Sequence, residues 1–260
     1  MLRPNMWVIG CLYRSPIHMV IDGDLTPILR ACSDEDLIPL RDYILSTSIN
    51  ELDIKDSYKA SPDRPSSYVN DLVYEISTFG GNTFANIFRG GGVPYAEVAR
   101  DVASKVGAKY DKNASVEEIE WAILSKILVQ AIKDMSPEER AKLEQIFRDA
   151  GADHVDLSAG FPLGLIMAQV GIRAAGFVAY QVAVIVANAV AKAILGRGLS
   201  FAANAALTRI IGMFAGPIGW VITGIWTAID IAGPAYRVTI PCVCHVAYLR
   251  LKNQYSGMEL

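Results

Sequence analysis

The chain has 260 residues, of which 52% are hydrophobic, and its formal net charge at pH 7 is only −3. This composition excludes a largely disordered protein, because apolar material for a core is plentiful. The chain also lacks a dense stripe of Lys and Arg, which argues against nucleic-acid binding.

The charge is divided unevenly along the chain. Residues 1–156 carry 17 Lys and Arg against 25 Asp and Glu, whereas residues 157–260 carry 7 against 2. Leu157–Ile229 contains no acidic residue and only four basic ones, Arg173, Lys192, Arg197 and Arg209. An apolar, mildly basic segment suits contact with lipid headgroups or with an acidic neighbouring domain.

Residues 1–18 form an irregular leader, broken by Pro4, Gly10 and Pro16. Two interpretations stay open: a frayed N-terminal arm, or a segment upstream of a true start at Met19. The only apolar run here is short and has no clear cleavage site, so we expect no secretory signal peptide. The four cysteines form no disulfide framework and favour a reducing compartment.

Residues 19–150 are predicted to form an acidic helical domain. Ser33 is expected to cap a helix whose first turn is acidic, and Ser115 and Ser136 each open a capping box. Apolar spacing predicts two further helices, over Tyr68–Phe79 and Pro94–Val106. The glycines that follow Phe79 predict a helix stop and a tight turn.

Residues 151–260 are predicted to form an apolar helical hairpin domain. Its two uncharged runs, Ala174–Ala191 and Ile210–Ile229, are rich in Ala, Gly, Ile and Val. The second run has the roughly 20 residues that a membrane span needs. A turn and a new segment are predicted over Asp230–Pro241, and a final helix over Val243–Leu251.

The second apolar run carries the residues that most suggest contact with lipid or with another helix. Its Gly-x-x-x-Gly pair would let helices approach closely in lipid. Two tryptophans lie inside the run, although tryptophan prefers membrane interfaces, and its proline is expected to kink or break the helix. The candidate membrane or packing residues are Gly212, Gly216, Pro217, Gly219, Trp220, Gly224 and Trp226.

No group of residues predicts an enzyme, a cofactor or a metal site. The glycines at 80, 81 and 90–92 lack the Gly-x-x-x-x-Gly-Lys-Ser/Thr pattern and the preceding strand of a phosphate-binding loop. Cys242, Cys244 and His245 have metal-ligating side chains, but no second ligand pair stands at a suitable spacing. Buried thiols on an apolar segment are the simpler interpretation.

Two motifs remain to be explained. The first begins at Phe79 and includes Phe79, Gly80, Gly81, Asn82, Asn86, Arg89, Gly90, Gly92 and Tyr95. The second, Ala235–Pro241, includes Tyr236, Arg237 and Pro241. We expect Arg237 to form a structural ion pair. The alternative is that Arg237 is a cation on a conducting path, paired with Asp230.

Together the two motifs resemble the signature of the YaaW family of uncharacterised bacterial proteins, and their wide separation makes the resemblance specific. The family is grouped more loosely with ubiquinol–cytochrome c chaperones, which are helical assembly factors. The resemblance implies an all-α fold. No residue motif in this chain carries the chaperone activity over.

We therefore predict an all-α multi-helix bundle, with the amphipathic N-terminal layer packed on or tethered to the Ala/Gly-rich hairpin. The leading hypothesis is a membrane-interacting protein that inserts the hairpin to perturb or permeabilise a bilayer. The alternatives are a non-enzymatic chaperone for an apolar or membrane-complex client, and a soluble globular all-α protein. Expected partners are membrane lipid or an apolar protein client, with oligomers forming through the glycine-rich helices. We expect no nucleic-acid partner, and a location in the bacterial cytoplasm or inner membrane.

Overall fold

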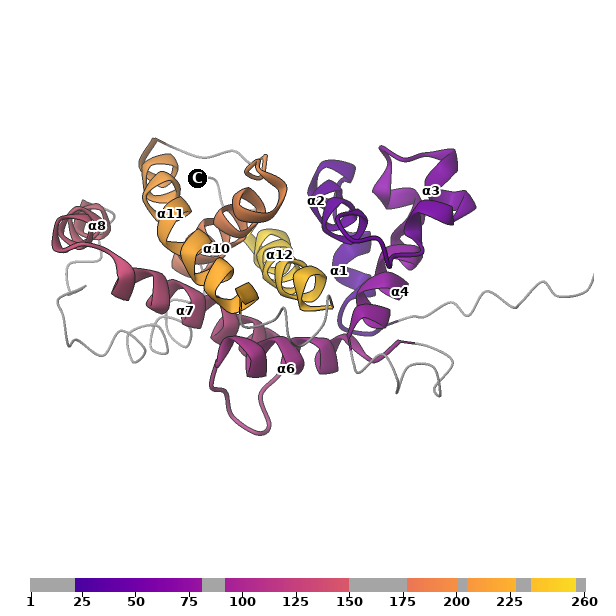
Figure 1. Cartoon of the computed structure of the whole chain (residues 1–260), viewed down its shortest axis with the longest axis horizontal. Coiled ribbons are helices and arrows are strands. Elements are labelled where there is room, and N and C mark those ends of the chain that lie inside the picture. The colour runs from indigo at the N-terminus through magenta and orange to yellow at the C-terminus, as the bar shows by residue number, and fades with distance from the viewer. Residues whose placement is uncertain (1–21, 81–91, 150–176, 201–204, 228–234, 256–260) are drawn as a thin grey trace, which may run out of the picture.

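The computed structural model describes residues 22–80, 92–149, 177–200, 205–227 and 235–255, and these residues form helices and turns with no strand among them (Figure 1). The all-α prediction is confirmed. The predicted domain boundaries at residues 18/19 and 150/151 lie outside the described residues and stay predictions.

The helices of the first half, in chain order, are α1 (Thr26–Arg30), α2 (Asp34–Leu45), η1 (Leu52–Ile54), α3 (Asp56–Ala60), η2 (Pro65–Tyr68), α4 (Val69–Phe79), α6 (Tyr95–Val106), α7 (Val116–Asp134) and α8 (Pro137–Asp149). Those of the second half are α10 (Phe177–Leu195), α11 (Ala205–Thr227) and α12 (Tyr236–Tyr255).

Local capping sets where three of these helices begin. The Ser33 side chain accepts a hydrogen bond from the backbone N–H of Asp36 and starts α2, and Ser115 does the same with Glu118 at α7. At α8 the Glu139 N–H donates to Ser136 Oγ over 3.2 Å. All three starts were predicted, because a cap depends only on residues within one turn of each other.

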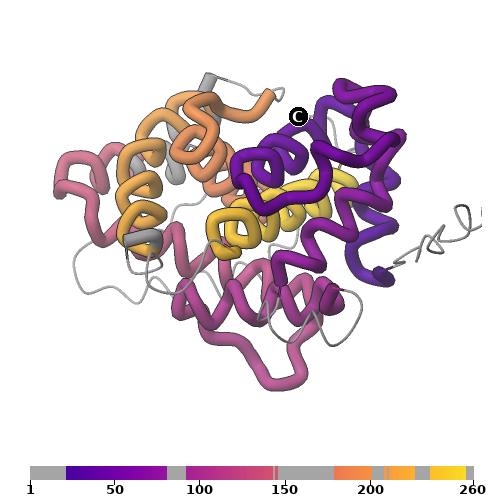
Figure 2. Tube along the Cα trace, turned by 45° about the vertical axis from the view of Figure 1, so that its right-hand side comes forward, coloured from indigo at the N-terminus to yellow at the C-terminus, as the bar shows by residue number. Residues whose placement is uncertain are grey.

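Helix α12 lies in the middle of the molecule, between the helices of the N-terminal half and the α10–α11 pair (Figures 1 and 2). Every residue from Val238 to Arg250 is buried. It packs against α1, α2, α4, α6, α7 and α10. A helix that is buried on all sides is a core element around which the other helices are arranged.

A buried ion pair ties the C-terminal half of α12 to α7. Arg250 Nε donates to Glu120 Oε2 over 2.8 Å, and Nη2 donates to Oε1 over 3.1 Å. The Tyr95 hydroxyl of α6 donates to the same carboxylate over 2.7 Å. Burial raises the pKa of Glu120, and the hydrogen bonds from Arg250 oppose that shift. Three helices therefore meet at one carboxylate.

A second set of contacts joins α12 to the N-terminus of α2. His245 Nε2 lies 2.7 Å from the carbonyl oxygen of Asp36, and Lys252 forms an ion pair with the Asp36 carboxylate. Burial lowers the pKa of His245 to about 4, so the ring is neutral at pH 7 and donates from Nε2 to that carbonyl. Asp36 thus caps its own helix and holds α12 as well.

The structure corrects the predicted start of the last helix. The chain is already helical at Tyr236, so residues 236–241 belong to α12 and are not part of a turn. Pro241 lies within this helix. Burial of the segment from Val238 onward compensates for the one backbone hydrogen bond that Pro241 cannot donate.

Of the predicted kink or break at Gly216-Pro217, the break is wrong, because α11 continues through Pro217 to Thr227. The kink stays a prediction. An interior proline costs a helix about 3 kcal/mol. The buried residues of α11 lie on one face at helical spacing: Ile211, Phe214, Ile218 and Ile222. Full burial of a large apolar side chain contributes roughly 1.5–3 kcal/mol, so this face outweighs the cost.

We expect Arg250→Ala to lower the free energy of unfolding by about 3–5 kcal/mol in urea denaturation, because it leaves the buried Glu120 carboxylate without its partner. The control is Glu117→Gln. Glu117 is 59% exposed and 3.7 Å from the same guanidinium, so its loss should cost under about 1 kcal/mol. Equal effects of the two substitutions would contradict the central role of the buried pair.

Glu75 of α4 makes stability depend on pH. Burial raises the pKa of its carboxyl to about 7, although Oε1 accepts a hydrogen bond from the Glu51 N–H over 3.0 Å. The folded state therefore holds this proton more tightly than the unfolded state does. The stabilisation is complete below the ordinary pKa of 4.5 and is lost as the pH rises toward 7.

Glu75→Gln should remove this pH dependence, because an amide keeps the oxygen that accepts the Glu51 N–H and cannot ionise. We expect the substitution to raise the free energy of unfolding above that of the wild type, and this gain should be roughly 2–3 kcal/mol larger at pH 8 than at pH 5. The size follows from about 1.36 kcal/mol per pKa unit. Denaturation curves at both pH values measure the difference. A difference that does not change with pH would refute the assignment.

Candidate functional site

The sequence-predicted residues fall in two regions: the ends of α4, α6 and α12, where the motifs lie, and helix α11. Five motif residues are outside the described part of the chain, namely Gly81, Asn82, Asn86, Arg89 and Gly90. The side chain of Trp226 and the whole of Asp230 are outside it too. The remaining predicted residues can be placed.

The first motif marks a tight backbone contact at the end of α4. The Val93 N–H donates to the carbonyl oxygen of Ser77 over 3.0 Å. A Cβ on Gly92 would lie 2.4 Å from the Ser77 carbonyl carbon, and one on Gly80 would lie 2.3 Å from Val98 Cγ2. Both positions need glycine for lack of space, so these motif residues serve packing. Phe79, which ends α4 as predicted, is buried beside them.

The motif tyrosine, Tyr95, joins three parts of the chain. Its N–H donates to Asp22 Oδ2 over 2.7 Å, and its hydroxyl donates to Glu120. Burial raises the pKa of the phenol, so the hydroxyl stays protonated and can donate. Tyr95 is fully buried and therefore has a structural role.

The second motif positions α12 on α6. Tyr236 is half-buried, with Lys105 Nζ 5.4 Å from its ring centroid, and Pro241 is fully buried. Arg237 is exposed. These placements give the motif a role in packing, and they bring no catalytic group together.

Burial keeps both cysteine side chains of α12 in the thiol form. Burial raises the pKa of Cys244 to about 12 and that of Cys242 further, so both remain thiols at neutral pH. Among the described residues, no group of three or more His, Cys, Asp or Glu side chains could hold a metal ion.

Helix α11 has two apolar faces, and only one is buried. Opposite the buried isoleucines and Phe214, a stripe of exposed residues repeats every fourth position: Gly212, Gly216, Trp220 and Gly224. Trp220 is 75% exposed, the largest fraction among the exposed large hydrophobic residues that the structure describes. Apart from the neighbouring residues in the chain, a Cβ on any of the three glycines would meet no described atom within 4 Å. By contrast, a Cβ on Gly219 would lie 4.0 Å from the Cβ of Ala193.

A groove of about 340 Å³ adjoins this stripe, between α11, α7 and the end of α6. Its apolar lining comes from Val106, Ile127, Trp220, Val221, Gly224 and Ile225. Lys126, Gln130 and Asp134 of α7 supply polar groups along the same groove. We call the stripe and the groove together the α11 surface.

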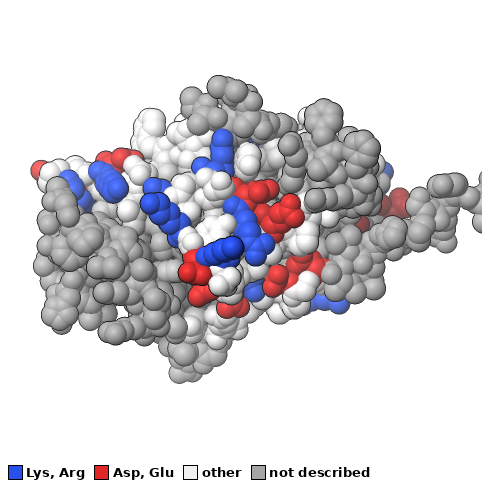
Figure 3. Space-filling view, turned by 90° about the horizontal axis from the view of Figure 1, so that it is seen from below, with Lys and Arg blue, Asp and Glu red and all other residues white. Residues whose placement is uncertain are grey.

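Charges are distributed differently around this surface and on the neighbouring face. Helices α10 and α11 contain no acidic residue, and Lys192, Arg197 and Arg209 are exposed there. On the face seen from below, basic and acidic side chains are interspersed in the described part (Figure 3). The charged residues of α10 and α11 are thus all basic.

Sequence reasoning identified the glycines and Trp220 from their spacing, but it missed the groove. The α7 and α6 sides of the groove come from residues about 100 positions earlier in the chain, and no periodicity links them to α11. Among the described residues, no helix has the length and apolarity to cross a bilayer, so the predicted span over Ile210–Ile229 finds no support there.

The chain is similar to curated bacterial proteins. It is 45% identical over 202 residues to a UPF0174 protein of Helicobacter pylori strain J99, covering 78% of each chain. It is 35% identical to a UPF0174 protein of H. pylori strain 26695, covering 75% of this chain and 93% of the relative. The UPF0174 protein YaaW of Escherichia coli K12 is 26% identical over 90% of this chain and 96% of its own length. No protein-family model and no solved structure matches.

A matched pair of glycine substitutions tests the placement of the stripe. We expect Gly212→Ala to raise the free energy of unfolding by about 1 kcal/mol, because alanine favours a helix and its methyl group meets no neighbour. Gly80→Ala should lower it by about 1–3 kcal/mol through the clash with Val98. Thermal and urea denaturation measure both. A destabilising Gly212→Ala would show that this face is packed inside the monomer.

Proposed function

The chain belongs to the UPF0174 family, and from this premise we propose that it is a non-enzymatic protein that binds an apolar helix of a partner on its α11 surface. The observation that carries the proposal is the row of exposed glycines beside Trp220. The role is that of a chaperone or assembly factor for an apolar client.

The glycines are the first argument. A glycine in an exposed helix costs about 1 kcal/mol relative to alanine. Gly80 and Gly92 have steric reasons within the chain, and Gly216 precedes Pro217, whose ring disfavours a Cβ on the preceding residue in a helix. Gly212 and Gly224 have no such reason among the described atoms. Their use is explained if a partner approaches the backbone of α11 more closely than a Cβ would allow. A second helix makes this kind of approach to a Gly-x-x-x-Gly face.

The groove is the second argument. A helix lying along the glycines would meet Trp220 on one side, and its apolar side chains could enter the groove lined by Ile127 and Ile225. A large aromatic side chain next to an apolar pocket is the usual arrangement of an energetic hot spot in a protein interface. Lys126 and Asp134 offer polar contacts at the rim.

Binding to the surface of a bilayer is the second candidate. The exposed Trp220, together with the exposed Lys192 and Arg209 on helices without acidic residues and the exposed Arg197 after α10, favours it. Fluid lipid chains do not need glycine for close approach, so the glycine stripe favours the helix partner. Perturbing or permeabilising a bilayer would be a further step beyond such surface binding.

The test uses two probes with the full chain: a fluorescent, Lys-flanked helical peptide of Leu and Ala, and vesicles of phosphatidylcholine with and without phosphatidylglycerol. We expect the peptide to bind the wild type, and Gly212→Leu to weaken binding at least about tenfold, equivalent to about 1.4 kcal/mol. The control, Arg100→Leu, adds the same side chain at an exposed position of α6 and should bind as the wild type does.

Unchanged peptide affinity in Gly212→Leu would reject the helix-binding proposal. Vesicle binding that needs phosphatidylglycerol and Trp220, without peptide binding, would establish the membrane candidate instead. Failure of both probes would leave a globular helical protein whose α11 surface binds neither.

A further inference from the structure

We propose that Arg209 makes the α11 surface selective for partner helices that carry a carboxylate. The inference rests on the proposed function, because it names the kind of helix that the α11 surface binds. The preferred partner is an apolar helix with one Glu or Asp close to the small residues that contact the glycines of α11.

Arg209 lies on the same face of α11 as the glycine stripe. It precedes Gly212 by three residues and Gly216 by seven, and these spacings bring side chains to one side of an α-helix. Arg209 is exposed, as are both glycines. Its Cα is only about 4.5 Å from that of Gly212 along the helix axis, because an α-helix rises about 1.5 Å per residue. A helix packed on the glycines therefore passes within reach of the guanidinium.

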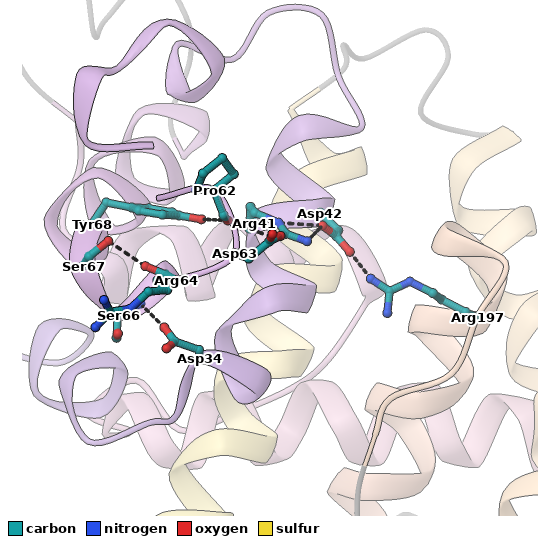
Figure 4. A network of polar contacts seen from close by, with 10 residues as sticks. All are labelled: Asp34, Arg41, Asp42, Pro62, Asp63, Arg64, Ser66, Ser67, Tyr68 and Arg197. Carbon is teal, nitrogen blue, oxygen red and sulfur yellow. Dashed lines mark hydrogen bonds and ion pairs between the residues drawn. The ribbon is translucent and has the colours of Figure 1, made fainter. Parts of the chain in front are cut away.

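A neighbouring arginine shows the contrast between a charge used within the chain and one that is not. Arg197 forms an ion pair with the Asp42 carboxylate of α2, which also accepts a hydrogen bond from Arg41 Nε over 2.8 Å (Figure 4). Arg209 has no such partner among the described residues, although α8 packs against α11 and contains glutamates. The charge of Arg209 is therefore available to a partner.

A carboxylate is the group that suits this position best. The guanidinium of Arg209 can donate parallel hydrogen bonds to both carboxylate oxygens. The first turn of α11 contains no acidic residue, so nothing in that turn offsets the positive end of the helix dipole. Farther along the surface, Lys126 and Asp134 line the groove with opposite charges, so the groove selects for neither sign. Selection for an acidic group therefore falls to Arg209.

Charge supplies a specificity that the apolar contacts lack. The glycines and Trp220 would accept many apolar helices, since contacts of this kind depend on shape and buried area. A carboxylate that pairs with Arg209 distinguishes one helix from others of equal hydrophobicity. The expected partner segment thus has the pattern Glu-x-x-small-x-x-x-small, in either chain direction, which mirrors the spacing of Arg209, Gly212 and Gly216.

The experiment compares two Lys-flanked helical peptides of Leu and Ala, each with a Gly-x-x-x-Gly pair. One peptide has Glu three residues outside each glycine, so that it can pair with Arg209 in either direction, and the other has Gln at both places. We expect the full chain to bind the Glu peptide about two- to fivefold more tightly, as one exposed ion pair allows. Added salt should remove this preference, because the pair is open to screening.

Arg209→Gln should abolish the preference for the Glu peptide, and Arg209→Glu should reverse it. The matched control is Arg100→Gln, which removes an exposed charge from α6 and should leave the preference intact. If the wild type binds both peptides equally, or if Arg209→Gln keeps the preference, the charge selection is wrong while helix binding stands. Binding of neither peptide would instead overturn both proposals.

Discussion

The structure depends on one buried carboxylate, Glu120, and on what satisfies it. Arg250 supplies two hydrogen bonds and Tyr95 a third, from helices that are distant in sequence. A buried charge without its partner is costly, so α6, α7 and α12 can pack together only in the arrangement that completes this set. The same requirement places α12 at the centre, where apolar residues surround it on all sides.

The position of α12 in turn determines what the hairpin can do. Helix α10 packs on α12 and on α11, and it is buried along most of its length. Helix α11 lies outside it, with its isoleucine face inward and its glycine face exposed. Helix α11, at the periphery of the bundle, thus leaves one apolar face exposed. This arrangement motivates the proposed helix-binding role.

Sequence reasoning succeeded where the physics is local. The capping serines at 33, 115 and 136 predicted three helix starts, and the glycine after Phe79 predicted a helix end. It failed at Pro217 and Pro241, where tertiary burial outweighs local helix-breaking. Arg250 and Glu120 are 130 residues apart, and only the fold brings them together.

The candidate site was predicted in part for the same reason. Spacing alone identified the glycine stripe and Trp220, because a single helix contains them all. The opposite wall of the groove belongs to α6 and α7, which a single sequence does not connect with α11. The motif glycines at 80 and 92 were identified as notable, and the structure explains them by close packing with Val98 and Ser77.

The central claim is that a helix of a partner protein lies directly on the glycine face of α11. Site-specific photo-crosslinking from position 212 in living cells, with the crosslinked residues identified by mass spectrometry, tests it most directly. The account predicts crosslinks to small or apolar residues three and four positions apart in one segment of another protein. Crosslinks confined to lipid, or to residues of this same chain within the monomer, would contradict it.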